Sequence, residues 1–591
     1  MSAVRTLARL LPYYRPYRRK VAWGVTLVVL SSAVASAVPW FLRQAIDALE
    51  AGGSTRRVVI LALAMVGVGA VAGLLRWAMR EVMNTMSRHI EYDLRADVFR
   101  ALVGLDAGFY GRMRTGEIMA RATNDIGAVR QAAGPAVMYL TNTIFGGIFA
   151  LLFMTRISGR LTLIALLPMV ALPFVMAWLG RLIHQRFEQV QAHFGELTTL
   201  AQENLAGVRV VRAYRQEAAE ERRFDAGSAE YLRLNLRLAA LYGIMHPVTG
   251  LLAGLGALAV LGLGGIMTMR GEITVGAYIA FGFYLGMLTW PLIALGWVTN
   301  LFQRGAASLG RLLEIIDAPP AITPPAVPRT LPPAGAGRSL EFRNVGFHYP
   351  VAAEHAGTGP RWVLRGVSAT VPVGGTLAIV GATGSGKSAL IDLVPRLHDP
   401  QEGEVLLDGV PVRDLPPEEL RAEIGYVPQE SFLFGESILA NLTYGGASDE
   451  AAREAAQVAQ LDETVRDFPG GYDTMLGERG INLSGGQKQR AALARALARR
   501  PRVVLLDDAL SAVDTHTEAE ILRGLRETLA GRTAVIASHR VSAVRDADWI
   551  IVLEEGRVVE QGRHPELLAA GGRYWSLLAR QRLEEAIETA P

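Results

Sequence analysis

The stretch "TLAIVGATGSGKSALIDLV", residues 376–394, decides the fold of the second half of the chain. It reads as a short apolar strand, a glycine-rich turn and an apolar helix start, and Gly381, Gly386, Lys387 and Ser388 match the pattern G-x-x-x-x-G-K-[ST]. The glycines let backbone N–H groups curl around a phosphate, and the helix N-terminus adds positive potential. Lys387 is expected to reach the β- and γ-phosphates, and the Ser388 hydroxyl to ligate Mg²⁺. The stretch predicts an α/β P-loop domain.

Composition limits the classes of protein that the chain can be. A chain of 591 residues is too long for one core and suggests at least two domains. Half of it is hydrophobic and the mean hydropathy is +0.24. The net charge of +4 is too small to argue for nucleic acid, and the absence of Cys excludes disulfides and a thiol nucleophile. Among 60 basic residues, lysine occurs only at positions 20, 387 and 488, so a lysine inside a P-loop pattern is informative.

Six long charge-free stretches lie in the first 303 residues. A helix needs about 20 residues to cross a hydrocarbon core, and only the second stretch is near the lower limit. The absence of charge inside the stretches argues against an ion-driven transporter. We therefore expect a membrane domain over 1–315, with spans near 21–42, 58–75, 131–155, 161–180, 238–269 and 273–303.

The charges beside these stretches predict their orientation. The leader before the first span carries five arginines and Lys20, which marks the cytoplasmic side of an inner membrane. An even number of spans then places both termini there. The inner loops 76–130 and 181–237 are rich in charge and helix formers, and a helix of about 25 residues reaches about 37 Å. Each loop is predicted to be a helical hairpin, with tips at 109–125 and 203–217 that dock onto a cytoplasmic domain.

The second half begins after a proline-rich linker, residues 316–337. A nucleotide-binding domain is predicted over 338–580, followed by a tail over 581–591. Within it, "VVLLDDALSAVD" (503–514) is an apolar run that ends in two carboxylates. Such a run predicts a buried parallel strand. In P-loop folds an acid at the end of a second strand holds Mg²⁺, and Asp507 fits that role.

The stretch "LSGGQKQR" (483–490) lies between the P-loop and that acidic strand. With it, the chain resembles an ABC transporter half-subunit of the exporter type over nearly its whole length. In that family the signature contacts the γ-phosphate of ATP bound on the opposite subunit. Ser484, Gly485 and Gly486 can offer a hydroxyl and bare backbone N–H groups at a helix start. The resemblance implies a six-helix membrane domain fused to an ABC nucleotide-binding domain. It implies ATP and Mg²⁺ as cofactors, and the bilayer and a second homologous half-transporter as partners.

Other family positions follow from the same resemblance. Tyr349 in "FHYP" resembles the aromatic that stacks on adenine, and Gln429 in "YVPQE" the glutamine that senses Mg²⁺ and the attacking water. "GERG" (477–480) resembles a segment that touches the partner's coupling helices, and "SAVD" (511–514) the D-loop at the dimer interface. The resemblance implies hydrolysis by Asp508, His539 and Gln429; metal binding by Ser388, Gln429 and Asp507; and nucleotide binding by Tyr349, Gly381, Thr383, Gly384, Ser385, Gly386, Lys387, Ser388, Ala389, Ser484, Gly485, Gly486 and Gln487.

Asp508 departs from the family pattern, which has Glu after the strand-end aspartate. The shorter side chain withdraws the carboxylate by roughly 1.5 Å, and errors of about 1 Å can cost a hundredfold in rate. A base must lie within hydrogen-bond reach of the proton that it takes. We therefore expect weak hydrolysis at this chain's own P-loop. Because the signature is intact, the pattern favours a heterodimer with one degenerate site. The alternative is a homodimeric exporter or lipid flippase in which Asp508 is slow.

The sequence thus predicts ATP-driven export of hydrophobic or amphiphilic cargo such as drugs, lipids or peptides. A nucleotide-gated channel or a regulatory membrane subunit is the rival of another class, and no long regulatory insertion supports it.

Overall fold

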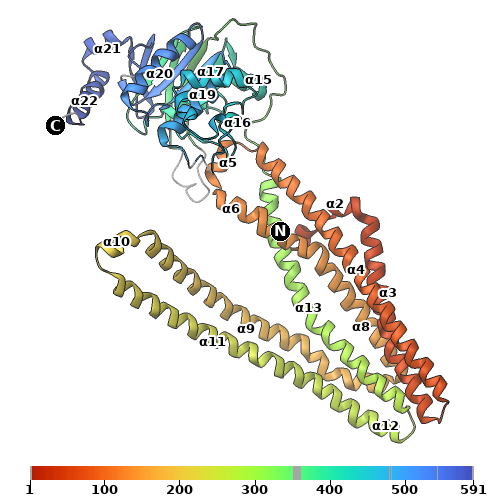
Figure 1. Cartoon of the computed structure of the whole chain (residues 1–591). Coiled ribbons are helices and arrows are strands. Elements are labelled where there is room, and N and C mark those ends of the chain that lie inside the picture. Colours follow the sequence, from red (N-terminus) through yellow and green to blue (C-terminus); the bar gives the residue numbers. More distant parts are fainter. Residues whose placement is uncertain (1–2, 350–360, 478–479, 481, 542–543, 589–591) are drawn as a thin grey trace. The chain divides into compact units, whose positions relative to one another are not determined.

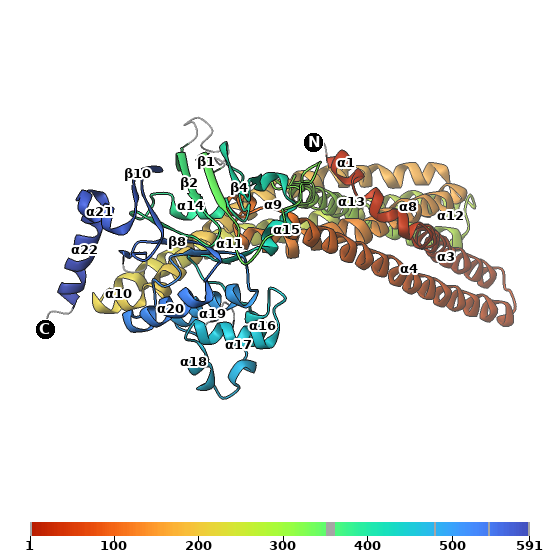
Figure 2. The same cartoon turned by 90° about the horizontal axis from the view of Figure 1, so that it is seen from above.

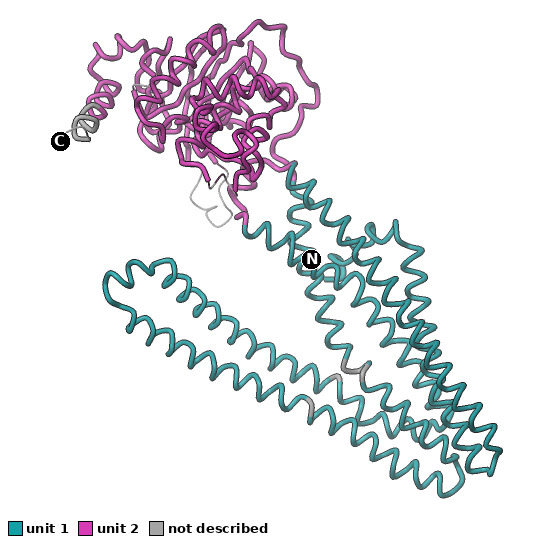
Figure 3. The backbone as a smooth tube through the Cα atoms, in the orientation of Figure 1, with its two compact units in different colours: residues 1–103, 116–318 teal, residues 104–115, 319–591 magenta. Residues whose placement is uncertain are grey.

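The computed structural model describes residues 3–349, 361–477, 480, 482–541 and 544–588. These residues form two compact units (Figure 3). Unit 1 comprises 1–103 and 116–318, and unit 2 comprises 104–115 and 319–591. Residues 104–115, which lie between two stretches of unit 1, are thus grouped with the second half of the chain.

Unit 1 is all helical. Among its described residues, six helices are long and apolar enough to cross a membrane, which confirms the predicted class of fold. Most residues in their windows of highest hydropathy are not buried, as expected of surfaces that face lipid or a second subunit. These helical runs are Ala3–Glu50, Thr55–Gly104, Thr115–Ile157, Gly159–Ala206, Glu217–Met269 and Val275–Ile316.

The individual helices of unit 1 follow the chain in simple order (Figure 1). Two of the runs contain π-helical turns, one at 121–125 and 132–136 and the other at 260–264. The helices are α1 (Ala3–Ala8), α2 (Leu11–Tyr14), α3 (Arg18–Glu50), α4 (Thr55–Gly104), α6 (Thr115–Ala120), α7 (Ile126–Gln131), α8 (Val137–Ile157), α9 (Gly159–Ala206), α10 (Val208–Ala213), α11 (Glu217–Ala259), α12 (Gly265–Met269) and α13 (Val275–Ile316).

Side-chain caps begin two of the spanning helices. Ser158 accepts a hydrogen bond from the backbone N–H of Leu161 at the start of α9. Thr274 accepts one from Ala277 at the start of α13. Each cap satisfies a backbone donor that has no partner inside the helix, which explains why the helices begin at these short polar breaks between apolar runs.

The two predicted hairpins differ in how they end. Helices α9 and α11 run side by side, and α10 closes their tip (Figure 1). Apolar and aromatic side chains of that tip are exposed, with Tyr214 74% and Val210 61% accessible. In the other hairpin the tip is α5 (Ala107–Arg112), within the segment 104–115 that belongs to unit 2. There the Asp106 carboxylate accepts hydrogen bonds from the N–H groups of Phe109 and Ala321.

Unit 2 is built on two sheets. The antiparallel sheet has the order β2-β1-β4-β5 and the larger one the order β10-β9-β3-β8-β7-β6. From β9 to β6 the larger sheet is parallel, so the carboxyl ends of its strands share one edge. The strands are β1 (Leu340–Phe347), β2 (Leu364–Val371), β3 (Thr376–Val380), β4 (Glu402–Leu407), β5 (Val410–Pro411), β6 (Ile424–Val427), β7 (Val503–Asp507), β8 (Thr533–Ser538), β9 (Trp549–Glu554) and β10 (Arg557–Gly562).

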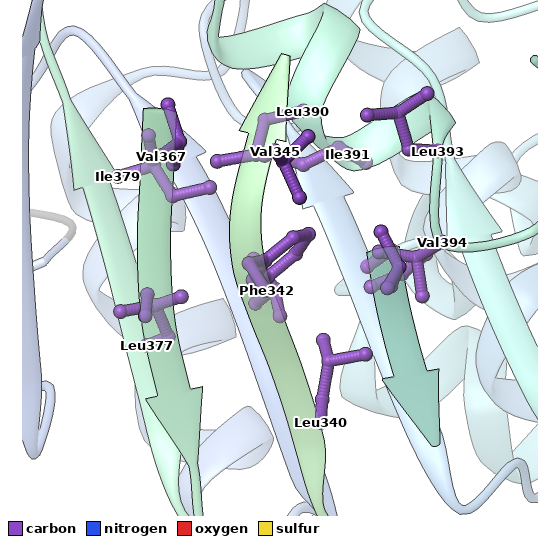
Figure 4. Packing of buried hydrophobic residues seen from close by; sticks show 14 of the residues in the cluster. Leu340, Phe342, Val345, Val367, Leu377, Ile379, Leu390, Ile391, Leu393 and Val394 are labelled. Carbon is purple, nitrogen blue, oxygen red and sulfur yellow. The ribbon is translucent and has the colours of Figure 1, made fainter. Parts of the chain in front are cut away.

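A hydrophobic core joins the two sheets around the helix that follows β3. That helix is α14 (Lys387–Asp392). Figure 4 shows Phe342 and Val345 of β1 facing Leu390 of α14 and Ile379 of β3, all essentially inaccessible. The P-loop between β3 and α14 is thereby fixed at both ends by burial of apolar surface.

Helices form the other part of unit 2, and they pack on a second core that includes buried side chains of β7. Figure 2 shows several of these helices on the side away from β1 and β2. They are α15 (Pro417–Ala422), α16 (Ile438–Leu442), α17 (Asp449–Val458), α18 (Asp462–Arg466), α19 (Gly485–Ala498) and α20 (Thr515–Thr528), and the chain ends in α21 (His564–Ala570) and α22 (Arg573–Glu588). Between α13 and β1 the chain is irregular, as the proline-rich sequence predicts.

Candidate nucleotide-binding site

The P-loop takes a backbone path that its glycines permit. Gly384 and Gly386 have φ of +82° and +104°, which side chains with a Cβ rarely adopt. A Cβ on Gly381 would lie 2.4 Å from the carbonyl oxygen of Leu553. Small residues are therefore required for the loop to turn back onto the start of α14, where backbone N–H groups can meet an anion.

Lys387 lies inside this loop and is 7% exposed. Its Nζ donates hydrogen bonds to the carbonyl oxygens of Gly381 and Ala382, at 2.9 and 3.1 Å. Burial lowers the pKa of the ammonium, and the carboxylates of Asp508 and Asp507 oppose that shift. The lysine is thus positioned where an anionic ligand in the loop would meet a positive charge.

Asp507 ends β7 and is 2% exposed. Ser388 forms a hydrogen bond with the side chain of Asp507. The Oδ1 atom of Asp507 nevertheless has no partner among the described residues. Burial raises the pKa of this carboxyl, and the nearby negative charge of Asp508 raises it further. A buried oxygen without a donor is costly unless a cation satisfies it.

The donor set around Asp507 fits Mg²⁺. This ion is commonly held by one or two carboxylates, with phosphate oxygens and waters completing the shell. The described residues contain no cluster of three or more histidine, aspartate or glutamate side chains suited to a metal. One orphaned carboxylate oxygen beside a serine hydroxyl therefore suits a metal that arrives with a nucleotide.

Asp508 turns sharply out of the sheet. Its φ is +44°, a left-handed conformation that is uncommon for residues other than glycine. Its N–H donates to the carbonyl oxygen of Ala537 at 2.9 Å. One carboxylate oxygen, Oδ1, accepts from both the backbone N–H and the Nδ1 of His539, at 3.1 and 2.9 Å. Because β7 and β8 are paired in parallel, the acid and the histidine meet at one sheet edge.

These elements enclose a cavity of about 200 Å³. Tyr349, at its mouth, is 45% exposed and packs edge-on to Phe347. A wider hollow of about 1100 Å³ adjoins it beyond Tyr349. The cavity is lined by Tyr349, Val363, Thr383, Gly384, Gly386, Lys387, Ser388, Ala389, Gln429 and Asp508. The sequence does not predict a role for Val363, because this residue precedes β2 and no motif surrounds it.

Some predicted residues lie elsewhere. Gly381 and Ser385 line a different hollow of about 470 Å³ beside α22, and the buried Oγ of Ser385 has no described partner. The predicted contacts Glu478 and Arg479 of "GERG" lie outside the described residues.

The signature residues do not line the cavity around the P-loop. The Oγ of Ser484 accepts from the N–H of Gln487, and the Gln487 side chain accepts from the N–H of Ser484. This reciprocal cap begins α19, and Ser484 and Gly485 are exposed. The start of α19 therefore presents its free N–H groups at the surface, away from this chain's own P-loop.

Comparisons with known proteins agree on one family. The model of the ABC transporter transmembrane region matches residues 21–292, and the ABC transporter model matches 364–511. A probable multidrug resistance ABC transporter ATP-binding/permease protein of Bacillus subtilis, YheI, is 36% identical over 98% of this chain and 97% of its own length. The multidrug resistance-like ATP-binding protein MdlA of Escherichia coli is 34% identical, over 100% and 98%.

A flippase and a solved structure extend the likeness. An ATP-dependent lipid A-core flippase of Syntrophus aciditrophicus is 31% identical over 98% of this chain and 95% of its own. The structure of a bacterial Atm1-family ABC exporter with ATP bound is similar with a TM-score of 0.76 and 30% identity, covering 95% of this chain and 98% of that chain.

Proposed function

This chain belongs to the ABC exporters as a half-transporter, and we propose that it pairs with a different homologous chain and hydrolyses ATP only weakly at its own P-loop. As a family member it is a multi-pass membrane protein that couples ATP hydrolysis to export, with ATP and Mg²⁺ as its cofactors. Membership of the family does not by itself say which chain is the partner or how fast ATP is hydrolysed at this chain's own P-loop.

The observation that carries the proposal is the geometry of Asp508. The side chain is one methylene shorter than glutamate, and its Oδ1 already accepts two hydrogen bonds from His539. A general base needs an oxygen within about 2.6–3.2 Å of the water that it activates. A short carboxylate that is held back against the histidine supports a weak base.

The exposed start of α19 supports the second half of the proposal. Ser484, Gly485 and Gly486 are arranged to meet an anion, yet they lie outside this chain's own cavity. In a head-to-tail dimer they would close over the nucleotide on the partner's P-loop. A chain with a weak base and a sound signature suits a partner with a glutamate base.

The other side chains take the remaining roles in this proposal. Tyr349 stacks on adenine, and Lys387 binds the β- and γ-phosphates. Asp507 and Ser388, with Gln429, would hold Mg²⁺, which would supply positive charge to neutralise the phosphate oxygens. His539 contacts the γ-phosphate through its free Nε2, since its Nδ1 faces Asp508. The loop glycines and Ala389 cradle the phosphates with backbone N–H groups.

Closure of the nucleotide domains would drive transport. The segment 104–115 belongs to this chain's nucleotide unit. The α10 tip exposes apolar side chains, which suit docking on the partner. Both termini are placed in the cytoplasm by the arginine-rich leader. The charge-free stretches within the spanning helices and the names of the relatives favour hydrophobic or amphiphilic cargo, including drugs and lipids.

A homodimeric exporter or lipid flippase is the alternative, and a lipid A-core flippase is among the relatives that match nearly the whole chain. Expression of the chain alone, followed by measurement of its mass in detergent and its ATPase rate, separates the two. The proposal expects poor dimers with slow turnover, and recovery on adding a homologue that carries glutamate at the position of Asp508. A stable homodimer with turnover equal to that of the reconstituted pair would contradict it.

A further inference from the structure

Gln489 is a buried polar side chain that none of the roles above uses. It lies in α19, two residues beyond the signature, and is 6% exposed. A glutamine in such a position must find partners for both its amide nitrogen and its oxygen, because an unsatisfied buried amide is costly.

All the partners of Gln489 lie on the loop that follows β7. Its Nε2 donates to the Oγ of Ser511 at 2.8 Å and, at 3.4 Å, to the carbonyl oxygen of Asp508. Its Oε1 accepts from the N–H of Ala512 at 2.9 Å. The side chain thus bridges the signature helix and the loop 508–514 from within the domain.

The same loop is also held by the segment that follows β8 and contains His539 and Arg540. Arg540 donates through one nitrogen to the carbonyl oxygen of Ser511 at 3.3 Å, and through another to Glu518 at 2.7 Å. The N–H of Ser511 donates to the carbonyl oxygen of Asp508 at 3.2 Å. Ser511 is therefore clamped between Gln489 and Arg540.

This clamp lies next to a residue whose backbone is strained. Asp508 has a left-handed backbone, and such conformations persist only where the surroundings hold them. The carbonyl oxygen of Asp508 accepts hydrogen bonds from the Gln489 side chain and from the N–H of Ser511. The carboxylate of Asp508 is hydrogen-bonded to His539. Loss of the contacts behind the turn would let the carboxylate move by a fraction of an ångström or more, and catalysis is sensitive to errors of that size.

We propose that Gln489 is a positioning residue that fixes the turn at Asp508 and ties it to the signature helix. When the start of α19 closes on a partner's nucleotide, the side-chain amide of Gln489 transmits the movement of α19 to Asp508 and His539. The inference rests on the proposed roles of Asp508 and the signature, but it does not depend on whether the dimer has identical chains.

The test uses two substitutions of similar shape in the full-length chain, assembled with its partner. Gln489→Met removes every hydrogen bond and keeps the volume, so it tests the clamp rather than a cavity. Gln489→Glu keeps an acceptor for the N–H of Ala512 and for the Ser511 hydroxyl, but it cannot donate to Asp508. The matched control is Arg490→Met on the same helix, because the hydrogen bonds of Arg490 go to Gln460 and Thr464, and only its charge acts on the end of this loop, at Asp514.

Steady-state ATPase kinetics, in a dimer whose partner site is silenced so that the rate reports the site of Asp508, and hydrogen–deuterium exchange are measured together. For Gln489→Met we expect kcat to fall about tenfold with KM for ATP within about twofold, since the loop moves while the P-loop does not. Gln489→Glu should recover part of that loss. Exchange should rise at 508–514, including the N–H of Ala512, and stay unchanged at 381–388.

The two arms separate this inference from the proposal on which it rests. If Gln489→Met keeps its kcat within twofold, or if exchange at 508–514 does not change, the positioning role is wrong. If the wild-type chain proves to be a fast homodimer, the heterodimer proposal fails while both measurements still decide the role of Gln489. If Arg490→Met lowers kcat as much and raises exchange at 508–514 equally, the effect belongs to α19 as a whole and the inference is overturned.

Discussion

Two charged side chains of the P-loop half of the nucleotide domain are buried, whereas the first residues of the signature helix α19 lie at the surface. Lys387 and Asp507 are less than one-tenth exposed, and each is fixed by neighbours in the same chain. Ser484 and Gly485 are exposed, and the capping bonds there run only between Ser484 and Gln487. One half can be explained by contacts within the chain. In the proposed function, the other half acts on a nucleotide that a second chain binds.

The first prediction tests this contrast by removing the buried positive charge of Lys387. Lys387→Met should weaken ATP binding by the solubilised chain by about a hundredfold or more, because the phosphates lose their closest positive charge. Lys488→Met is the control, since it removes a lysine from the signature helix and leaves the P-loop intact. Equilibrium binding of a fluorescent ATP analogue measures both. Equal effects of the two substitutions would break the distinction between the halves.

The second prediction concerns the surface half. A Cβ on Gly486 would lie 2.6 Å from the carbonyl oxygen of Ala512, whereas one on Gly485 would meet only the Cβ of Ala512 at 3.6 Å. Gly486→Ala should therefore lower ATPase turnover of the assembled dimer about thirtyfold, through a displaced signature, and Gly485→Ala should cost less. Binding of ATP to the chain's own P-loop should stay within about twofold. A large loss of that binding would mean that the halves are not separate.

The third prediction concerns a longer side chain at Asp508, the proposed weak base. Asp508→Glu should raise turnover at this chain's own site about tenfold, because the added methylene returns the carboxylate toward the water. The rate is measured in a dimer whose partner site is silenced. Asp508→Asn, which keeps the length and removes the charge, should abolish the residual rate. Unchanged or slower turnover in the glutamate variant would show that side-chain length is not the limit.

The smallest expected effect is on stability. Burial raises the pKa of Asp507 above its unfolded value, so its neutral form contributes stability that is present at acid pH and lost as the pH rises through the folded pKa. Asp507→Asn should therefore raise the melting temperature of the nucleotide-free protein by about 2–4 °C at pH 7.5, and the gain should vanish at acid pH. Asp473→Asn, at an exposed site, is the control. A lower melting temperature at pH 7.5 would contradict this account of the site.

The two halves also differ in how far the sequence could predict them. The P-loop pattern and the buried strand ending in Asp507 depend on local spacing, so the sheet edge that gathers them was predictable. The six spanning helices follow from uninterrupted apolar length. The clamp by Gln489 was not predictable, because it depends on which tertiary neighbours a buried amide meets. The same holds for Val363 in the cavity lining and for the left-handed turn at Asp508.

The grouping of residues 104–115 with the nucleotide unit has a consequence for how the molecule can be taken apart. The chain passes between the two units at three places, near 103, 115 and 318. A protease cut between residues 318 and 321 would thus leave the halves joined by α5, because the Asp106 carboxylate accepts a hydrogen bond from the N–H of Ala321. A fragment that begins at residue 319 would be missing a piece of its own surface. Adding a peptide of residues 104–115 should restore that surface.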